Sequence, residues 1–180
     1  MKRLLKILFI SAIMAIICSA CAAGNVHDKN YLRAIAIDGD VEKEMTLTFF
    51  VKEGDSVTAK GDDISSALKS AELKSGNQIV TGYTELVILD ELNGRETLEF
   101  LLNVWKVSPS CIIVYCEDGD KILENNSSDA LIGSVERAIV QEKIPKSDII
   151  TVLGKLLNDE RRAEIASISV DGVIGTHIIE

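Results

Sequence analysis

The sequence predicts an α/β (α+β) fold: a mixed β-sheet built around a central strand-helix-strand unit, with further helices packed on it. Two continuous apolar runs, Leu86–Leu89 and Cys111–Cys116, are typical of strands buried on both faces of a sheet. Apolar residues between the runs recur with the period of a helix, at Leu98, Leu101, Leu102 and Trp105. A helix of this length lets the two strands lie parallel, joined by a right-handed crossover.

The boundaries of this unit, which spans Tyr83 to Leu123, are marked by residue types with known preferences. Asn93 is expected to cap the helix, and Glu96, at the third helical position, to reach back to the cap. Pro109 ends the helical segment, and the second strand is expected to stop at the acidic turn Glu117–Asp120.

A hairpin is expected before this unit and another after it. Tyr31–Ile37 and the alternating residues 45–51 predict two antiparallel strands joined through Asp38-Gly39-Asp40, with a polar loop at Glu53–Lys60. At the other end, the apolar segments Ile165–Val170 and Val173–Ile179 are separated by Asp171-Gly172. An Asp-Gly pair between apolar segments is a strong hairpin signal.

Three more helices are predicted from caps and apolar period. The first is capped by Asp62 or Asp63 and ends at Gly76. The other two follow the central unit, separated by Pro145, and Ser147 is expected to cap the second. The apolar faces of the three are Ile64, Ala67, Leu68 and Ala71; Leu131, Val135, Ala138 and Ile139; and Ile149, Val152, Leu153 and Leu156.

Composition favours one ordered domain and argues against nucleic acid as a partner. The chain has 180 residues, of which 47% are hydrophobic and only 2 are proline. It carries 19 basic and 28 acidic residues, and removing Lys2, Arg3 and Lys6 with a signal segment leaves 16 against 28, a net charge of −12. Nucleic-acid binding requires a basic surface that displaces counterions from phosphates, and no basic patch is evident.

The amino terminus indicates export and a lipid anchor. A basic start followed by an apolar run from Leu4 to Ile17 is typical of a signal peptide, expected to span residues 1–20. Ser19-Ala20-Cys21 resembles the lipobox of bacterial lipoproteins, with Cys18 where that motif prefers Leu. We therefore expect lipidation at Cys21, a tether over residues 21–30, a single domain over residues 31–180 and attachment to the lipid membrane. An ordinary cleaved signal or an uncleaved anchor is the alternative, although the run is shorter than a span of about 20 residues.

Few residues in the remaining chain are suited to catalysis or metal binding. Cys111 and Cys116, five apart in one strand, are expected on opposite faces about 16 Å apart, which excludes a disulfide and favours two core thiols. His27 falls in the tether, and His177 is expected to be an edge-strand residue and not a base. No nucleophile elbow, phosphate loop or metal spacing is present, and the acidic turns lack the spacing of a calcium loop. The sequence therefore predicts no enzyme activity, no cofactor and no metal.

A family resemblance adds to this interpretation. After the cysteine lipobox come, in order, YLRAIAIDGD, ISSALKSAELKSGNQIVTGYTELVILDE, LEFLLNVWKVSPSCIIVYCEDGDKIL and the closing ASISVDGVIGTHIIE. These segments resemble the amino-terminal domain of the C-subunit lipoproteins of spore germinant receptors, the GerAC family. The chain departs from that family at Ala22–Asn25, where a charged cluster is typical, and at Tyr83-Thr84, where His is common. The family's larger carboxy-terminal region is expected to be absent.

The resemblance implies a role in spore germination. It implies a non-enzymatic, lipid-anchored subunit on the outer face of the spore's inner membrane, acting with two integral-membrane subunits, of A and B type, in the response to nutrient germinants. Two other functions remain open at this stage: a general envelope lipoprotein that binds a small ligand or an envelope partner, and an extracytoplasmic enzyme. A deep pocket with convergent polar groups would favour either of these.

Overall fold

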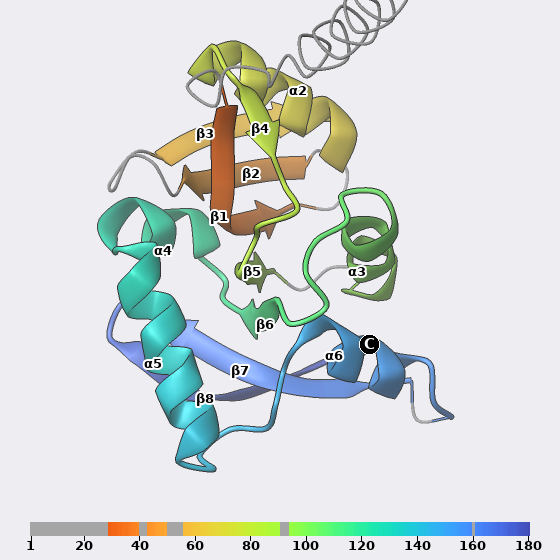
Figure 1. The fold of residues 1–180 in the computed structure, drawn as a ribbon. Coiled ribbons are helices and arrows are strands. Elements are labelled where there is room, and N and C mark those ends of the chain that lie inside the picture. Colours follow the sequence, from red (N-terminus) through yellow and green to blue (C-terminus); the bar gives the residue numbers. More distant parts are fainter. Residues whose placement is uncertain (1–28, 40–42, 50–55, 91–93, 160) are drawn as a thin grey trace, which may run out of the picture.

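One mixed sheet organises the structure, a computed structural model that describes residues 29–39, 43–49, 56–90, 94–159 and 161–180. The strand order is β3-β2-β1-β5-β6-β7-β8, and β4 pairs with the start of β1 (Figure 1). The strands are β1 (Lys29–Asp38), β2 (Lys43–Phe49), β3 (Ser56–Gly61), β4 (Gln78–Val80), β5 (Leu86–Leu89), β6 (Ile112–Tyr115), β7 (Ala163–Ser169) and β8 (Gly172–Ile179). The described helices are α2 (Ile64–Ser75), α3 (Gly94–Asn103), α4 (Gly119–Asn125), α5 (Ser128–Val140) and α6 (Ile149–Leu156). The predicted α+β class with a mixed sheet is confirmed.

The predicted strand-helix-strand unit lies at the centre of the sheet. Strands β5 and β6 pair in parallel from Leu86↔Ile112 to Leu89↔Tyr115, and β1 lies parallel on the other side of β5. All residues of both strands are buried. Because both faces of these strands are covered, their sequences are apolar throughout instead of alternating.

Helices cover both faces of the sheet and divide the core in two. One core cluster lies under α2, α3 and α6, and the other under α4 and α5, which are on the opposite side of the sheet in Figure 1. Alternate residues of β6 point to opposite faces, so Cys111 belongs to the first cluster and Cys116 to the second. Both thiols are free and buried, as expected from their odd spacing.

The two predicted hairpins are present. Strands β1 and β2 pair antiparallel, as do β7 and β8, whose connection contains Asp171-Gly172. Gly172 has a φ of 103°, a backbone conformation that glycine adopts without a side-chain penalty. Helix α2 is also as predicted: Asp63 accepts a hydrogen bond from the Ser66 backbone at 2.6 Å, and Gly76 ends the helix with φ 74°.

Trp105 is buried as expected, but it does not lie in the helix. Helix α3 ends at Asn103, and Lys106 has a φ of 57°, so the chain turns immediately beyond the tryptophan. The indole ring packs edge to face on Phe100, with ring centroids 6.1 Å apart, and contributes to the larger core cluster. The predicted cap Asn93 lies outside the described residues.

Two elements contradict the sequence-based predictions. The segment Ser56–Gly61, predicted as part of a polar loop, is the edge strand β3, paired with β2. Only Ala59 in it is buried, so this edge strand retains the polar composition of a loop. The acidic turn after β6 leads directly into α4, a helix of 7 residues that was not predicted because its buried apolar side chains are only Ile122 and Leu123.

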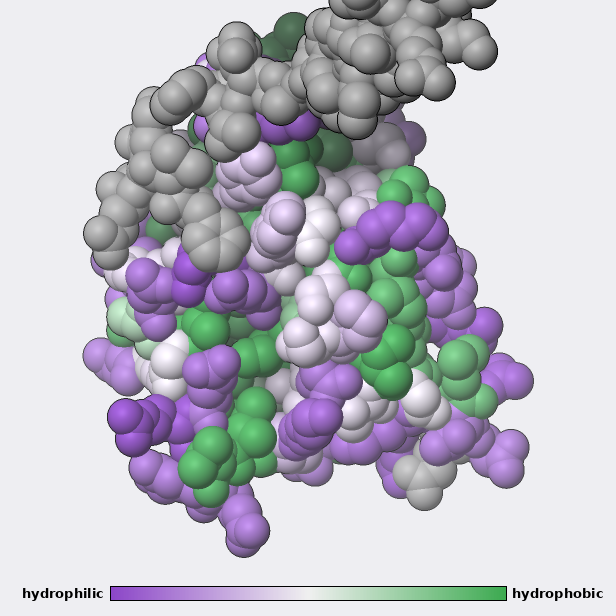
Figure 2. All heavy atoms as spheres, viewed as in Figure 1, coloured by the Kyte–Doolittle hydropathy of each residue, from purple (hydrophilic) through white to green (hydrophobic). Residues whose placement is uncertain are grey.

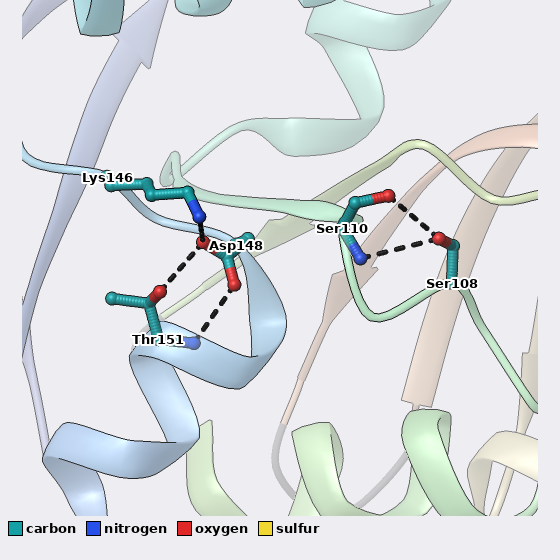
Figure 3. A network of polar contacts seen from close by, with 5 residues as sticks. All are labelled: Ser108, Ser110, Lys146, Asp148 and Thr151. Carbon is teal, nitrogen blue, oxygen red and sulfur yellow. Dashed lines mark hydrogen bonds and ion pairs between the residues drawn. The ribbon is translucent and has the colours of Figure 1, made fainter.

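The cap of α6 is Asp148 and not Ser147, so that prediction is wrong. Asp148 accepts hydrogen bonds from the backbone and side chain of Thr151 and pairs with Lys146, as Figure 3 shows. Partial burial opposes ionisation, but these hydrogen bonds and the ion pair outweigh it and lower the Asp148 pKa. Ser147 is fully buried, and its carbonyl accepts a hydrogen bond from the Ile113 backbone, so it joins the loop to β6 instead of capping the helix.

Candidate interaction surface

The described cysteines lie in the core of the domain. Among the described residues, no three His, Cys, Asp or Glu side chains are arranged to hold a metal ion. Burial raises the pKa of both the Cys111 and Cys116 thiols, which keeps them in the weakly reactive neutral form. His27 and Cys21 lie outside the described residues.

His177 lies on the edge strand, as expected, and packs against the sheet. Its ring stacks on Tyr115 of β6, with centroids 3.5 Å apart and planes 5° apart. Tyr115 pairs with Ser167 of β7, and Ser167 pairs with Gly175 of β8. Because both of these residues are small, they leave room for the two rings to meet. The histidine therefore contributes to the packing of the outer strands.

Acidic residues converge where the parallel strands end. Asp38 ends β1, Asp90 follows β5, and Asp118 and Asp120 lie at the start of α4. Burial, reinforced by repulsion from Asp120, Asp90, Glu44 and Asp118, raises the pKa of Asp38 to about 7. From the sequence, Asp38, Asp118 and Asp120 were placed in acidic turns that lack the spacing of a calcium loop, and Asp90 was not singled out. Carboxyl ends of neighbouring parallel strands meet at one edge of a sheet, and this rule could have predicted the cluster.

The open edge of β8 is the most exposed apolar feature of the sheet. Among the described residues no strand pairs with its outer side. Three large apolar side chains of this hairpin are exposed: Val170 at 62%, Ile174 at 65% and Ile178 at 56%. We call the outer edge of β8 with these three side chains the β8 surface. An unprotected apolar edge is a surface on which another polypeptide can pair.

A pocket adjoins the β8 surface. It has a volume of about 340 Å³ and lies between α4 and the β7–β8 hairpin. Its apolar lining includes Tyr115, Cys116, Ile122, Ile168, Val170 and Ile174. Asp118 and Lys121, which form an ion pair at 2.5 Å, also line it. Apolar area next to an unpaired strand edge favours a protein contact more than catalysis.

Elsewhere the exposed apolar side chains are dispersed. Figure 2 shows separate hydrophobic groups among hydrophilic side chains on the face that carries α3 and α5. Leu73 on α2, at 85% exposure, and Val140 at the end of α5 are isolated examples. Single exposed apolar residues are normal on soluble surfaces and indicate no site by themselves.

Tyr83-Thr84, one of the two positions at which the chain departs from the family pattern, lies just before β5. Thr84 is fully buried, and its hydroxyl donates to the Thr81 carbonyl at 2.6 Å. Tyr83 is exposed and packs edge to face on Tyr31 at the start of the sheet, with ring centroids 5.4 Å apart. Residues 81–84 therefore form a tight turn, with Tyr83 at its centre and Thr84 at its end, that leads into β5.

Fold and surface together define the class: an α+β domain with one mixed sheet, a closed edge at β3 and an open apolar edge at β8. The described residues contain no helix with both the length and the apolar character needed to cross a membrane.

Comparison with family models identifies the family of the chain. The model described as the spore germination protein N-terminal domain matches residues 24–170, more than half of the chain, and the protein belongs to this family. Neither the curated proteins nor the solved structures contain a match.

Proposed function

We propose that the protein is a membrane-anchored lipoprotein subunit of a spore nutrient-germinant receptor, and that it acts by protein–protein contact and not as an enzyme. The observation that carries the proposal is the family match over residues 24–170, since this family consists of germinant-receptor subunits and is no known enzyme family. The partners in this proposal are the integral-membrane A- and B-type subunits, and the protein lies on the extracytoplasmic face of the spore's inner membrane.

The proposed anchor restricts where the domain can be. Lys29, the start of β1, is eight residue steps beyond Cys21, and a fully extended chain of that length spans at most about 29 Å. A lipid on Cys21 would therefore hold the Lys29 end of β1 within that distance of the bilayer. Such confinement raises the effective concentration of the domain next to a membrane subunit, so that a weak interface suffices for assembly.

The β8 surface is the proposed contact with a membrane subunit. No described strand pairs with its backbone hydrogen-bonding groups on the outer side, and exposed apolar side chains flank them. An extended segment of the partner would continue the sheet and gain main-chain hydrogen bonds, while the isoleucines provide apolar contact. The edge at β3 does not offer this arrangement because α2 and charged side chains cover it.

Lipidation at Cys21 is tested by two cysteine variants. Stable attachment needs two lipid signals, which a diacylglyceryl cysteine supplies, so Cys21→Ala is expected to release the protein from the membrane or leave its signal peptide uncleaved. Cys18→Ala is the matched control, because it removes the neighbouring cysteine and leaves the lipidated one. Membrane fractionation and mass measurement of the mature protein give the readout. Unchanged retention and processing of Cys21→Ala would contradict the proposed anchor.

A general envelope lipoprotein that binds a small ligand is the second candidate, and the pocket beside α4 favours it. That function requires ligand binding without membrane subunits. A fluorescent apolar probe such as anilinonaphthalene sulfonate, added to the purified full chain, tests it: stoichiometric binding that is blocked by Ile174→Trp, at an exposed residue of the pocket lining, would favour this candidate over the receptor subunit.

A further inference from the structure

The carboxyl group of Asp38 lies half-buried beneath the first residue of α4. Its Oδ1 atom is buried and has no hydrogen-bond partner among the described residues. Gly119 begins α4 directly against this site, and a Cβ built on it would lie 2.9 Å from Ala36 Cβ, 3.0 Å from Ile88 Cγ2 and 3.5 Å from Asp38 Oδ1. Only glycine fits there. The start of α4 therefore packs as closely as a backbone can on the ends of β1 and β5.

Every element that packs around Asp38 contributes negative charge. Asp118 and Asp120 face it from α4, Asp90 from the end of β5 and Glu44 from β2. Three lysines lie in the same region, and each binds another acceptor. Lys43 donates to the Gly39 carbonyl at 2.7 Å, Lys60 pairs with Glu44 at 2.7 Å and Lys121 pairs with Asp118 at 2.5 Å.

Helix α4 has weak attachments of its own. It has only 7 residues, and no side chain caps its amino end at Asp118. It is held mainly by packing of Ile122 and Leu123 on the sheet. An ionised Asp38 at this position repels Asp118 and Asp120 and opposes the packing of α4, whereas a neutral carboxyl does not.

We propose that Asp38 is a proton-linked switch that holds α4 against β1 when it is neutral and loosens the start of α4 when it is ionised. Lys121 and Ile122 of α4, with Asp118 just before the helix, line the pocket beside the β8 surface, so the switch changes one wall of that pocket. The inference goes beyond the proposed receptor function and does not depend on it.

The direction of the pH effect follows from the raised pKa of Asp38. That pKa is about 7 in the folded protein and about 3.9 in an unfolded chain, so the folded state retains a proton that the unfolded state has lost. The stabilising contribution of this group is complete below pH of about 4 and decreases as pH rises toward 7. Above the folded pKa it is lost, and α4 is the helix expected to loosen.

Amide hydrogen exchange of the full-length protein in detergent tests the switch. The reporters are the α4 amide groups, including the Ile122 and Asn126 N–H groups that bond to Asp118 and Ile122 carbonyls. After correction for intrinsic exchange rates, protection in α4 is expected to fall roughly thirtyfold from pH 5.5 to pH 8.5 if opening restores the ordinary carboxyl pKa. In Asp38→Asn the fall should be less than about threefold, because the side chain cannot ionise.

A control variant with the same loss of charge, and a direct titration of Asp38, complete the test. Asp171→Asn removes the same charge from the distant β7–β8 turn and should keep the wild-type pH response. The carboxyl ¹³C resonance of Asp38 in the unmutated protein should titrate near pH 7. A midpoint below about 5, α4 protection that does not change with pH, or an unaltered pH response in Asp38→Asn would each overturn the proposal.

Discussion

The two edges of the sheet differ in how they are protected. The edge at β3 is short and polar: Lys60 pairs with Glu44, Lys74 of α2 donates to the Thr58 carbonyl at 2.7 Å, and α2 packs over the strand. The edge at β8 has 8 residues, no proline and no charged side chain. Natural proteins normally blunt exposed edges with charge, proline or a covering element. The contrast indicates that the β3 edge is closed by the domain itself, whereas the β8 edge is left available for a partner.

If the edges differ mainly in their availability to a partner, most of the stability comes from the centre of the sheet. Trp105→Ala is therefore expected to give the largest effect, a loss of about 3–5 kcal/mol in the free energy of unfolding, because it leaves a cavity beside Phe100 and the central strands. Val104→Ala, one residue away and exposed, is the control and should change it by less than about 0.5 kcal/mol. Urea denaturation measures both. A loss below about 1 kcal/mol for Trp105→Ala would place the indole outside the core.

The end of α2 at Gly76 tests how much this helix contributes to stability at the β3 edge. Gly76 ends α2 in the left-handed region, with φ 74°, so Gly76→Ala should destabilise the protein by about 1–2 kcal/mol. The same substitution at Gly133, inside α5 with open space around it, should stabilise by about 0.5–1 kcal/mol. Thermal unfolding reports both signs, and equal shifts for the two variants would refute the assigned role of Gly76.

Changes at the open edge should affect stability least. Ile174 and Ile178 are largely exposed, so Ile174→Lys combined with Ile178→Lys should alter the free energy of unfolding by less than about 0.5 kcal/mol. Urea midpoints of the double variant and the unmutated protein provide the measurement. A loss of more than about 2 kcal/mol would mean that these side chains support the fold, and the β8 surface would then be no free contact surface.

The central part of the fold could be predicted from the sequence because its local signals agree with its burial. Strands covered on both faces must be apolar at every position, so Leu86–Leu89 and Ile112–Tyr115 were recognisable. Asp63 and Gly76 mark the ends of α2 through local geometry alone. The edge strand β3 and the short helix α4 were missed because few of their side chains are buried, and weak burial leaves little apolar pattern.

The candidate site was harder to predict because it depends on strand order. The sequence identifies β8 as a strand, but only the pairing of β7 with β6 places β8 at the outside of the sheet. Likewise, Asp38 and Asp120 are distant in sequence and meet only because β1, β5 and β6 end at the same edge. Ser147 and Asp148 illustrate the limit of cap prediction, since both residue types cap helices and the choice follows from contact with β6.

The most direct measurement of the central claim is co-purification from spores. A tagged, unmutated protein is expected to retain the A- and B-type membrane subunits after detergent extraction. Leu73→Lys is the control for added positive charge, since it places one lysine at an exposed leucine on α2, and it should retain them equally. Ile174→Lys with Ile178→Lys should reduce recovery at least tenfold, which corresponds to about 1.4 kcal/mol of binding free energy. Equal recovery with all three proteins, or no membrane subunit with the unmutated one, would contradict the account.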